Sequence, residues 1–216
     1  MTGPDLVQFD WERSAAGRQR LAGVDEAGRG CWAGPVVAAA VILPAGYDLV
    51  GLDDSKRLTA RRRERLFEVI RADALSWAAT AVSPADIDRI NILQASLEAM
   101  RRAVARLRPA PELVLVDGRQ LPTLPCRGEP LVGGDGRSAA IAAASVVAKV
   151  LRDRVMRVWD RRYPGYSFAR HKGYGSTLHR DALLQLGPCP IHRRTYRPIA
   201  QLDQGRLWQD SGKETS

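Results

Sequence analysis

Hydrophobic residues in this chain gather in short runs, and longer segments with helical spacing separate the runs. The run over 35–43 is apolar at nearly every position, which is typical of a strand buried on both faces of a sheet. Shorter runs at 21–25, 75–82 and 112–116 also have the composition of strands. The pattern therefore predicts a sheet that contains at least one fully buried strand.

The longer segments predict helices. Thr59 is a suitable N-cap for a helix over 60–74, and Pro84 fits the first position of a short helix. An amphipathic helix is expected over 92–107, and another helix over 177–186. Strands and helices thus alternate, but in an irregular order.

The longest predicted helix spans about 138–162. Small residues at 142–145 allow this helix to approach a sheet closely. Lys149 and Asp153 are four residues apart on another side of the helix and can form an ion pair. Six residues at three- and four-residue spacing predict its buried stripe: Ile141, Ala144, Ala148, Leu151, Val155 and Val158.

This order of elements predicts an α/β fold with a mixed central sheet flanked by helices and a helical C-terminal region. The 216 residues are enough to bury one sizeable core. We expect one domain over 20–200. A polar leader over 1–19, with a short helix near 9–13, precedes it, and a disordered tail over 201–216 follows.

Charge indicates an anionic partner. The chain has 33 Lys and Arg against 24 Asp and Glu, a net charge of +9. Between 149 and 197 there are 12 basic and 3 acidic residues, so this segment is the expected footprint for nucleic acid. Arg193 and Arg194 lie in a stretch expected to be exposed and basic. The alternative is that the charge serves solubility alone.

Only four of the 33 basic residues are lysines, and three of them lie in compact settings. Lys56 follows Ser55, Lys149 lies in the long helix, and Lys172 lies in a glycine-flanked loop. A compact ammonium differs from a guanidinium fork, so these lysines are candidates for contact with phosphate or carboxylate groups.

Other chemistry is limited. The three cysteines are scattered without a CxxC pair, which indicates reduced thiols and a cytoplasmic protein. No uninterrupted apolar stretch is long enough to predict a membrane span. The sequence contains neither a P-loop nor an evident Ser-His-Asp arrangement.

Acidic residues follow two of the predicted strands. Asp25 and Glu26 end the first, Asp117 ends the strand over 112–116, and Asp135 emerges from a glycine-rich stretch. Neighbouring side chains on a strand point to opposite faces, so Asp25 and Glu26 share a ligand only if the strand ends there or Glu26 offers its main-chain oxygen. Carboxylate oxygens suit Mg²⁺ or Mn²⁺, and two such ions can clamp a phosphodiester. Each acid alone could also be an ordinary turn residue.

Two loops suit a nucleic-acid ligand. Gly28, Arg29 and Gly30 form a cationic loop whose backbone can come close to a phosphodiester. Tyr174 lies in a basic, glycine-flanked loop, where a base or sugar can stack on its ring. Packing of Tyr174 in the core is the competing interpretation.

Together these motifs resemble ribonuclease HII, in family order and over roughly 20–200. The matching segments are Gly23-Val-Asp-Glu-Ala-Gly-Arg-Gly30, Asp54-Ser-Lys56, Val116-Asp-Gly118, Gly134-Asp135, Ala143-Ala-Ser-Val-Val-Ala-Lys149 with Arg152-Asp153, and His171-Lys-Gly-Tyr-Gly175. Many relatives have Lys-Gly-Asp-Ser where this chain has Gly133-Gly-Asp-Gly136, so the loop around Asp135 has one cation fewer.

The resemblance implies a ribonuclease H-like fold and cleavage of RNA in RNA–DNA hybrids and at single ribonucleotides in duplex DNA. We expect the protein to be a monomer. The resemblance assigns two Mg²⁺ or Mn²⁺ ions to Asp25, Glu26, Asp117 and Asp135. It assigns the ribonucleotide-sensing loop to Gly28, Arg29 and Gly30 and the junction-sensing tyrosine to Tyr174. Further expected substrate contacts are Ser55, Lys56, Lys149 and Lys172, and less directly Asp153, Arg193 and Arg194. Two other classes stay open: another metal nuclease on this fold, such as a junction resolvase, and a non-catalytic basic nucleic-acid binder.

Overall fold

A computed structural model of the chain describes residues 3–47 and 58–203. Its centre is a five-stranded sheet in the order β3-β2-β1-β4-β5. β1 pairs antiparallel with β2, and β2 with β3, whereas β1–β4 and β4–β5 are parallel pairs, so the sheet is mixed as expected. The strands are β1 (Leu21–Ala27), β2 (Val36–Ile42), β3 (Ser76–Val82), β4 (Leu113–Asp117) and β5 (Arg127–Leu131).

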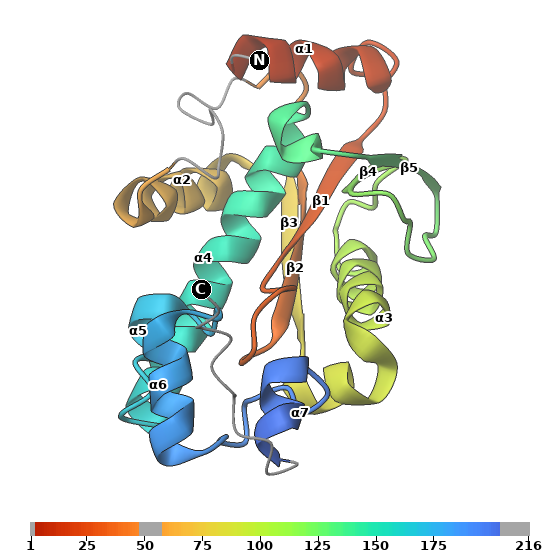
Figure 1. The fold of residues 1–216 in the computed structure, drawn as a ribbon. Coiled ribbons are helices and arrows are strands. Elements are labelled where there is room, and N and C mark those ends of the chain that lie inside the picture. Colours follow the sequence, from red (N-terminus) through yellow and green to blue (C-terminus); the bar gives the residue numbers. More distant parts are fainter. Residues whose placement is uncertain (1–2, 48–57, 204–216) are drawn as a thin grey trace, which may run out of the picture.

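Helices cover both faces of the sheet (Figure 1). On one side lie α1 (Gly3–Arg13), α2 (Ala60–Asp73) and α4 (Ala139–Arg162), and on the other lies α3 (Pro84–Ala105). The long helix α4 lies directly against β1. The two elements are so close that a Cβ added at Gly23 would stand 2.1 Å from the backbone of Ala140. This close approach brings the C-terminal end of β1 beside the middle of α4.

Local signals set most helix ends. The Thr59 side chain accepts a hydrogen bond from the Arg62 amide, as expected for the N-cap of α2. The two helices expected after Ser83 are joined into one element, α3. It is kinked at Asn91, which has a positive φ of 65° and whose side chain caps the amide of Gln94.

The predicted stripe of α4 is correct in its first half and wrong in its second. Ile141, Ala144 and Ala148 are buried, but Val158 is 53% exposed while Met156 is fully buried. The reason is that α4 extends beyond the sheet. Its last turns pack against the C-terminal region, which contacts a different side of the helix than the sheet does.

β5 was not expected, because its segment was assigned to a loop over 119–130. Its sequence, Arg-Gly-Glu-Pro-Leu, has no apolar alternation, and most of its residues are not buried. Proline and charged residues are typical of an edge strand, where hydrogen bonding is needed on one side only. The strand is held by parallel pairing to β4.

The C-terminal region consists of α5 (Phe168–His171), α6 (Thr177–Leu186) and α7 (Arg197–Asp203). α6 has the predicted bounds, but the disordered tail predicted from 201 is wrong at 201–203, which belong to α7. Residues 204–216 lie outside the described part of the chain. No helix in the described ranges is long and apolar enough to cross a bilayer.

The leader folds onto the domain. Leu6 of α1 is buried in the core, and the Asp10 carboxylate accepts a hydrogen bond of 2.8 Å from the Ala140 amide at the start of α4. Burial of Asp10 outweighs these hydrogen bonds and raises its pKa from 3.8 to about 6.

This pKa gives a prediction for stability. Because folding raises the pKa of Asp10, its contribution favours the folded state below about pH 4 and is lost as the pH rises through 6. The native protein should therefore lose up to about 3 kcal/mol of unfolding free energy between pH 4 and 8, relative to Asp10→Asn. Denaturant titrations of both proteins across this range measure the difference, and a constant difference would contradict the assignment.

Candidate active site

Asp25 and Asp117 stand side by side at one edge of the sheet. Val24 of β1 is paired with Val116 of β4, and the two strands are parallel, so the next residue of each strand is an aspartate at the same edge. Asp25 is only 7% exposed, and its carboxylate accepts a hydrogen bond of 2.7 Å from the Glu26 amide. The topology thus brings together two acids that are 92 positions apart in the sequence.

Asp135 reaches the same edge from a short 3-10 turn, Gly134–Gly136. The Gly134 amide donates a hydrogen bond of 2.7 Å to the Asp117 carboxylate, which ties this turn to the end of β4. Asp135 is buried. The turn is therefore fixed in the site, although its glycine-rich sequence did not predict a fixed position.

Burial and mutual repulsion dominate the electrostatics of these acids. Burial, followed by the nearby Glu26 carboxylate, raises the pKa of Asp25 well above its usual range, and Asp117 adds to the shift. Burial also raises the pKa of Glu26, against the lowering effect of Arg29. Bound cations would offset this cost, and a donor set of carboxylate oxygens suits a hard divalent ion.

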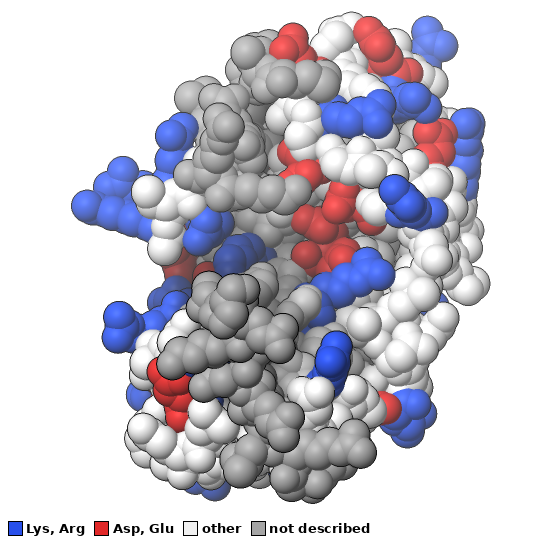
Figure 2. Space-filling view, viewed as in Figure 1, with Lys and Arg blue, Asp and Glu red and all other residues white. Residues whose placement is uncertain are grey.

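As the side chains are placed, no three acidic, histidine or cysteine residues in the described ranges are arranged to hold a metal ion. Figure 2 shows acidic side chains gathered near the middle of one face, with basic side chains to either side. Asp25 is further held by a hydrogen bond with Ser145 of α4. The fit to a divalent ion therefore rests on the chemistry and neighbourhood of the donors.

The loop after β1 lies directly beside these acids. Gly28 has a φ of +95°, and a Cβ there would stand 1.8 Å from the Arg152 guanidinium, so only glycine fits. A Cβ at Gly30 would meet nothing within 4 Å, which leaves that side open. The Arg29 guanidinium lies 3.4 Å from the Glu26 carboxylate and is half exposed.

A cleft of about 370 Å³ joins several of the predicted residues. Tyr174 stands at this cleft, and the residue is 44% exposed, so it is not a core residue. The Lys149 ammonium lies 5.4 Å from the centre of the Tyr174 ring and forms an ion pair of 2.8 Å with Asp153. The cleft is lined by Glu26, Ala27, Gly28, Arg29, Gly30, Arg63, Ser145, Lys149 and Tyr174.

Other predicted contacts have different positions. Lys172 is partly buried, donates to the Ala169 carbonyl and does not line the cleft, and burial lowers its pKa. Arg194 is exposed, and its amide binds the Asp88 carboxylate at 2.8 Å. Ser55 and Lys56 fall outside the described residues.

The expectation that Arg193 is exposed was wrong. Arg193 is fully buried, and its guanidinium donates to the carbonyls of Gly28, Arg29 and Gly34 at 2.6 to 3.0 Å. It therefore fixes, from the protein interior, the backbone of the loop Gly28-Arg29-Gly30, which we call the glycine loop. A count of basic residues cannot distinguish such a guanidinium from one that faces solvent.

Two further supports were given no role in the sequence analysis. Arg152, also fully buried, donates to the carbonyls of Ala33, Pro35 and Lys172, and so links the segment between β1 and β2 to the loop that carries Tyr174. His179 binds the Tyr174 carbonyl at 2.9 Å. The partners of Arg152 lie 20 to 119 positions away, so no local pattern predicts them. Tyr174 is only five positions from His179, but no sequence pattern indicated this contact.

The family model described as Ribonuclease HII matches residues 22–199. This chain belongs to the ribonuclease HII family. The family assignment makes it an endoribonuclease and confirms the resemblance found in its sequence.

The ribonuclease HII of Syntrophotalea carbinolica is 52% identical over 195 residues, which cover 90% of this chain and 93% of that protein. The structure of ribonuclease H2 from Pyrococcus horikoshii OT3 has a TM-score of 0.71 at 26% identity, over 87% of this chain and 98% of that one. Bst-RNase HIII, solved in complex with Mn²⁺, has a TM-score of 0.69 at 17% identity, over 88% and 71%. That last likeness concerns the fold alone.

Proposed function

We propose that this ribonuclease HII hydrolyses the RNA strand of RNA–DNA hybrids and incises duplex DNA on the 5′ side of single ribonucleotides, leaving a 3′-hydroxyl and a 5′-phosphate. Such incision would begin ribonucleotide excision repair. The free thiols of Cys31, Cys126 and Cys189 fit a cytoplasmic protein.

One observation supports the chemistry above all: the acids from β1, β4 and the 134–136 turn meet at one sheet edge, beside the glycine loop. Asp25, Glu26, Asp117 and Asp135 would hold two divalent ions, Mg²⁺ or Mn²⁺. Ions bound there would supply Lewis acidity for the attacking water and the leaving oxygen of the phosphodiester. The protein's own part is to keep these carboxylates buried, adjacent and correctly oriented.

Recognition of the ribonucleotide is assigned to the glycine loop. The 2′-hydroxyl is the only difference between the two sugars, and it both donates and accepts hydrogen bonds. Main-chain groups of Gly28 and Gly30 would meet this hydroxyl, and Arg29 would hold the adjacent phosphate. The open space at Gly30 and the exposure of Arg29 support this assignment.

Tyr174 is the proposed sensor of the next sugar. The Arg152 guanidinium lies 5.8 Å from the centre of its ring, and His179 binds its backbone carbonyl. The ring would pack on a deoxyribose on the 3′ side. Lys149 in the same cleft would contact a phosphate.

The substrate is tested by cleavage of end-labelled oligonucleotides with Mg²⁺ or Mn²⁺. Four substrates share one sequence: an RNA–DNA hybrid, an RNA duplex, a DNA duplex and a DNA four-way junction. We expect cleavage of the RNA strand of the hybrid alone. Cleavage of the junction would indicate a resolvase, and binding of all four without cleavage would indicate a non-catalytic binder.

Replacing Tyr174 with alanine gives a prediction on selectivity. The variant should lose about tenfold more kcat/KM on a duplex with one ribonucleotide than on a continuous hybrid, because stacking on one sugar or base contributes about 1–3 kcal/mol. Its melting temperature should change little, since the side chain is exposed. Equal losses on both substrates would reject the sensing role.

A further inference from the structure

Helix α2 has a basic outer face that the site described above does not include. Arg61, Arg62 and Arg65 are all exposed, and we call these three residues the α2 arginine face. Figure 2 shows basic side chains projecting from this side of the molecule. The face borders a groove of about 520 Å³ that is also lined by Thr59, Leu66 and Val69.

The acidic residues of α2 do not neutralise this face. Glu64 pairs with Arg154 and Arg157 of α4 at 2.5 and 2.7 Å. Glu68 pairs with Arg71, and Asp73 accepts a hydrogen bond from Tyr47. The two ion pairs of Glu64 also join α2 to α4. Within the described ranges, the outward side of the first turns of α2 is therefore purely cationic.

Helix stability does not explain the arginines. Arg61 and Arg62 lie in the first turn of α2, which contains no acidic residue, and positive charge is unfavourable near a helix N-terminus. Arg61 and Arg65 are like charges four residues apart, which destabilises a helix by about 0.2–0.5 kcal/mol. These arginines are unfavourable both for the helix dipole and for like-charge spacing, which indicates that they serve an anionic ligand.

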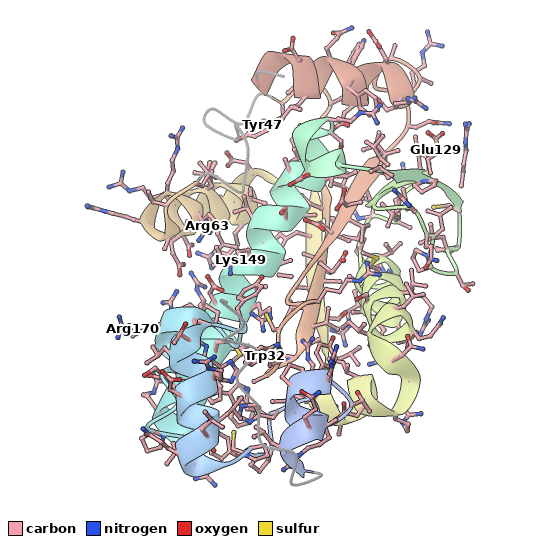
Figure 3. All side chains as sticks on the ribbon, in the orientation of Figure 1. Trp32, Tyr47, Arg63, Glu129, Lys149 and Arg170 are labelled. Carbon is pink, nitrogen blue, oxygen red and sulfur yellow. The ribbon has the colours of Figure 1, made fainter. Side chains whose placement is uncertain are left out.

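The α2 arginine face adjoins the active-site cleft. Arg63, from the same helical turn, lines that cleft together with Glu26 and Lys149. In Figure 3, Arg63 on α2 lies close above Lys149 on α4. A nucleic-acid strand that leaves the cleft on this side would therefore meet the α2 arginine face next.

We propose that the α2 arginine face binds the phosphate backbone of the duplex that flanks the cleavage point on one side. The inference rests on the proposed nucleic-acid substrate, but it adds a contact outside the cleft and outside the segment 149–197. Phosphate contacts of this kind position a duplex without reading its sequence. The face should thus extend the footprint and raise affinity for every duplex alike.

The first test measures binding in the absence of cleavage. The triple variant R61Q/R62Q/R65Q is titrated against an all-DNA duplex without divalent ions, by fluorescence anisotropy between 50 and 200 mM salt. A control, R18Q/R106Q/R108Q, removes the same charge from exposed arginines that follow α1 and α3, outside the segment 149–197. Glutamine keeps helix propensity, so the melting temperature should not fall in the α2 variant.

We expect the slope of log Kd against log salt to fall by about 3 in the α2 variant and to stay unchanged in the control. An equal change in both variants would mean that net charge alone matters and would overturn the proposal. No change in either would overturn it as well. Neither outcome depends on whether the protein cleaves RNA.

The second test locates the contact. Duplexes with one ribonucleotide are shortened on the 5′ arm or on the 3′ arm, and kcat/KM is measured for the native protein and the α2 variant. The variant should lose about tenfold or more on the full-length duplex. Shortening one arm should abolish this difference and shortening the other should preserve it. A difference independent of both arms would refute the flanking contact, whereas no cleavage by the native protein would refute the proposed function instead.

Discussion

Replacing Asp25 or Asp117 with asparagine is expected to lower kcat/KM at least about a thousandfold, equivalent to several kcal/mol of lost charge stabilisation. Asparagine has nearly the same shape but cannot supply the negative oxygen that a divalent ion requires. The fold should stay intact, because burial and the neighbouring acids already disfavour the charge on Asp25. Without metal, the melting temperature of Asp25→Asn should equal or exceed that of the native protein.

Glu129→Gln is the matched control for this pair. Glu129 lies on β5, where it pairs with Arg13 and Arg127, and Figure 3 shows it far from the cleft residues. Its replacement should leave kcat/KM nearly unchanged. Near-native turnover of Asp25→Asn or Asp117→Asn at saturating Mn²⁺ would remove the central pair from the mechanism.

The second large effect is expected for Arg193→Met. Methionine fills much of the same space but donates nothing, so the carbonyls of Gly28, Arg29 and Gly34 lose their hydrogen bonds from the guanidinium. The Arg29 carbonyl keeps one hydrogen bond, from the Tyr196 hydroxyl. One such loss costs about 1–3 kcal/mol, so the free energy of unfolding should fall by about 3 kcal/mol or more. Displacement of the glycine loop by about 1 Å should also lower kcat/KM about a hundredfold.

The adjacent Arg194 offers the control. Arg194 is exposed, so Arg194→Met makes the same chemical change without removing support from the loop. Denaturant titration and kcat/KM on a hybrid should separate the two variants clearly. If Arg193→Met resembles Arg194→Met in both measurements, the buried guanidinium does not position the loop.

Much of the fold was predictable where the pattern reflects a single environment. The run over 35–43 became the buried strand β2, and Thr59 caps the helix that begins beside it. The prediction failed where one element has two environments or few internal signals. The second half of α4 leaves the sheet for the C-terminal region, and β5 is an edge strand with a polar sequence.

The candidate site shows the same division. Asp25 and Asp117 were identifiable because each ends an apolar strand, and the parallel pairing of β1 and β4 then places them together. Arg193 was misassigned, and Arg152 was matched to a family motif but given no role, because the carbonyls they bind lie up to 165 positions away. A sequence pattern reports the residue's own surroundings along the chain, not its partners across the fold.

One measurement tests the central claim directly: mapping of the cut in a DNA duplex that contains one ribonucleotide, beside the identical all-DNA duplex, with Mg²⁺ or Mn²⁺. The account predicts a single incision at the 5′ phosphate of the ribonucleotide, ending in a 3′-hydroxyl and a 5′-phosphate, and no incision of the all-DNA duplex. Equal cleavage of both duplexes, or a cut whose position ignores the ribonucleotide, would contradict it.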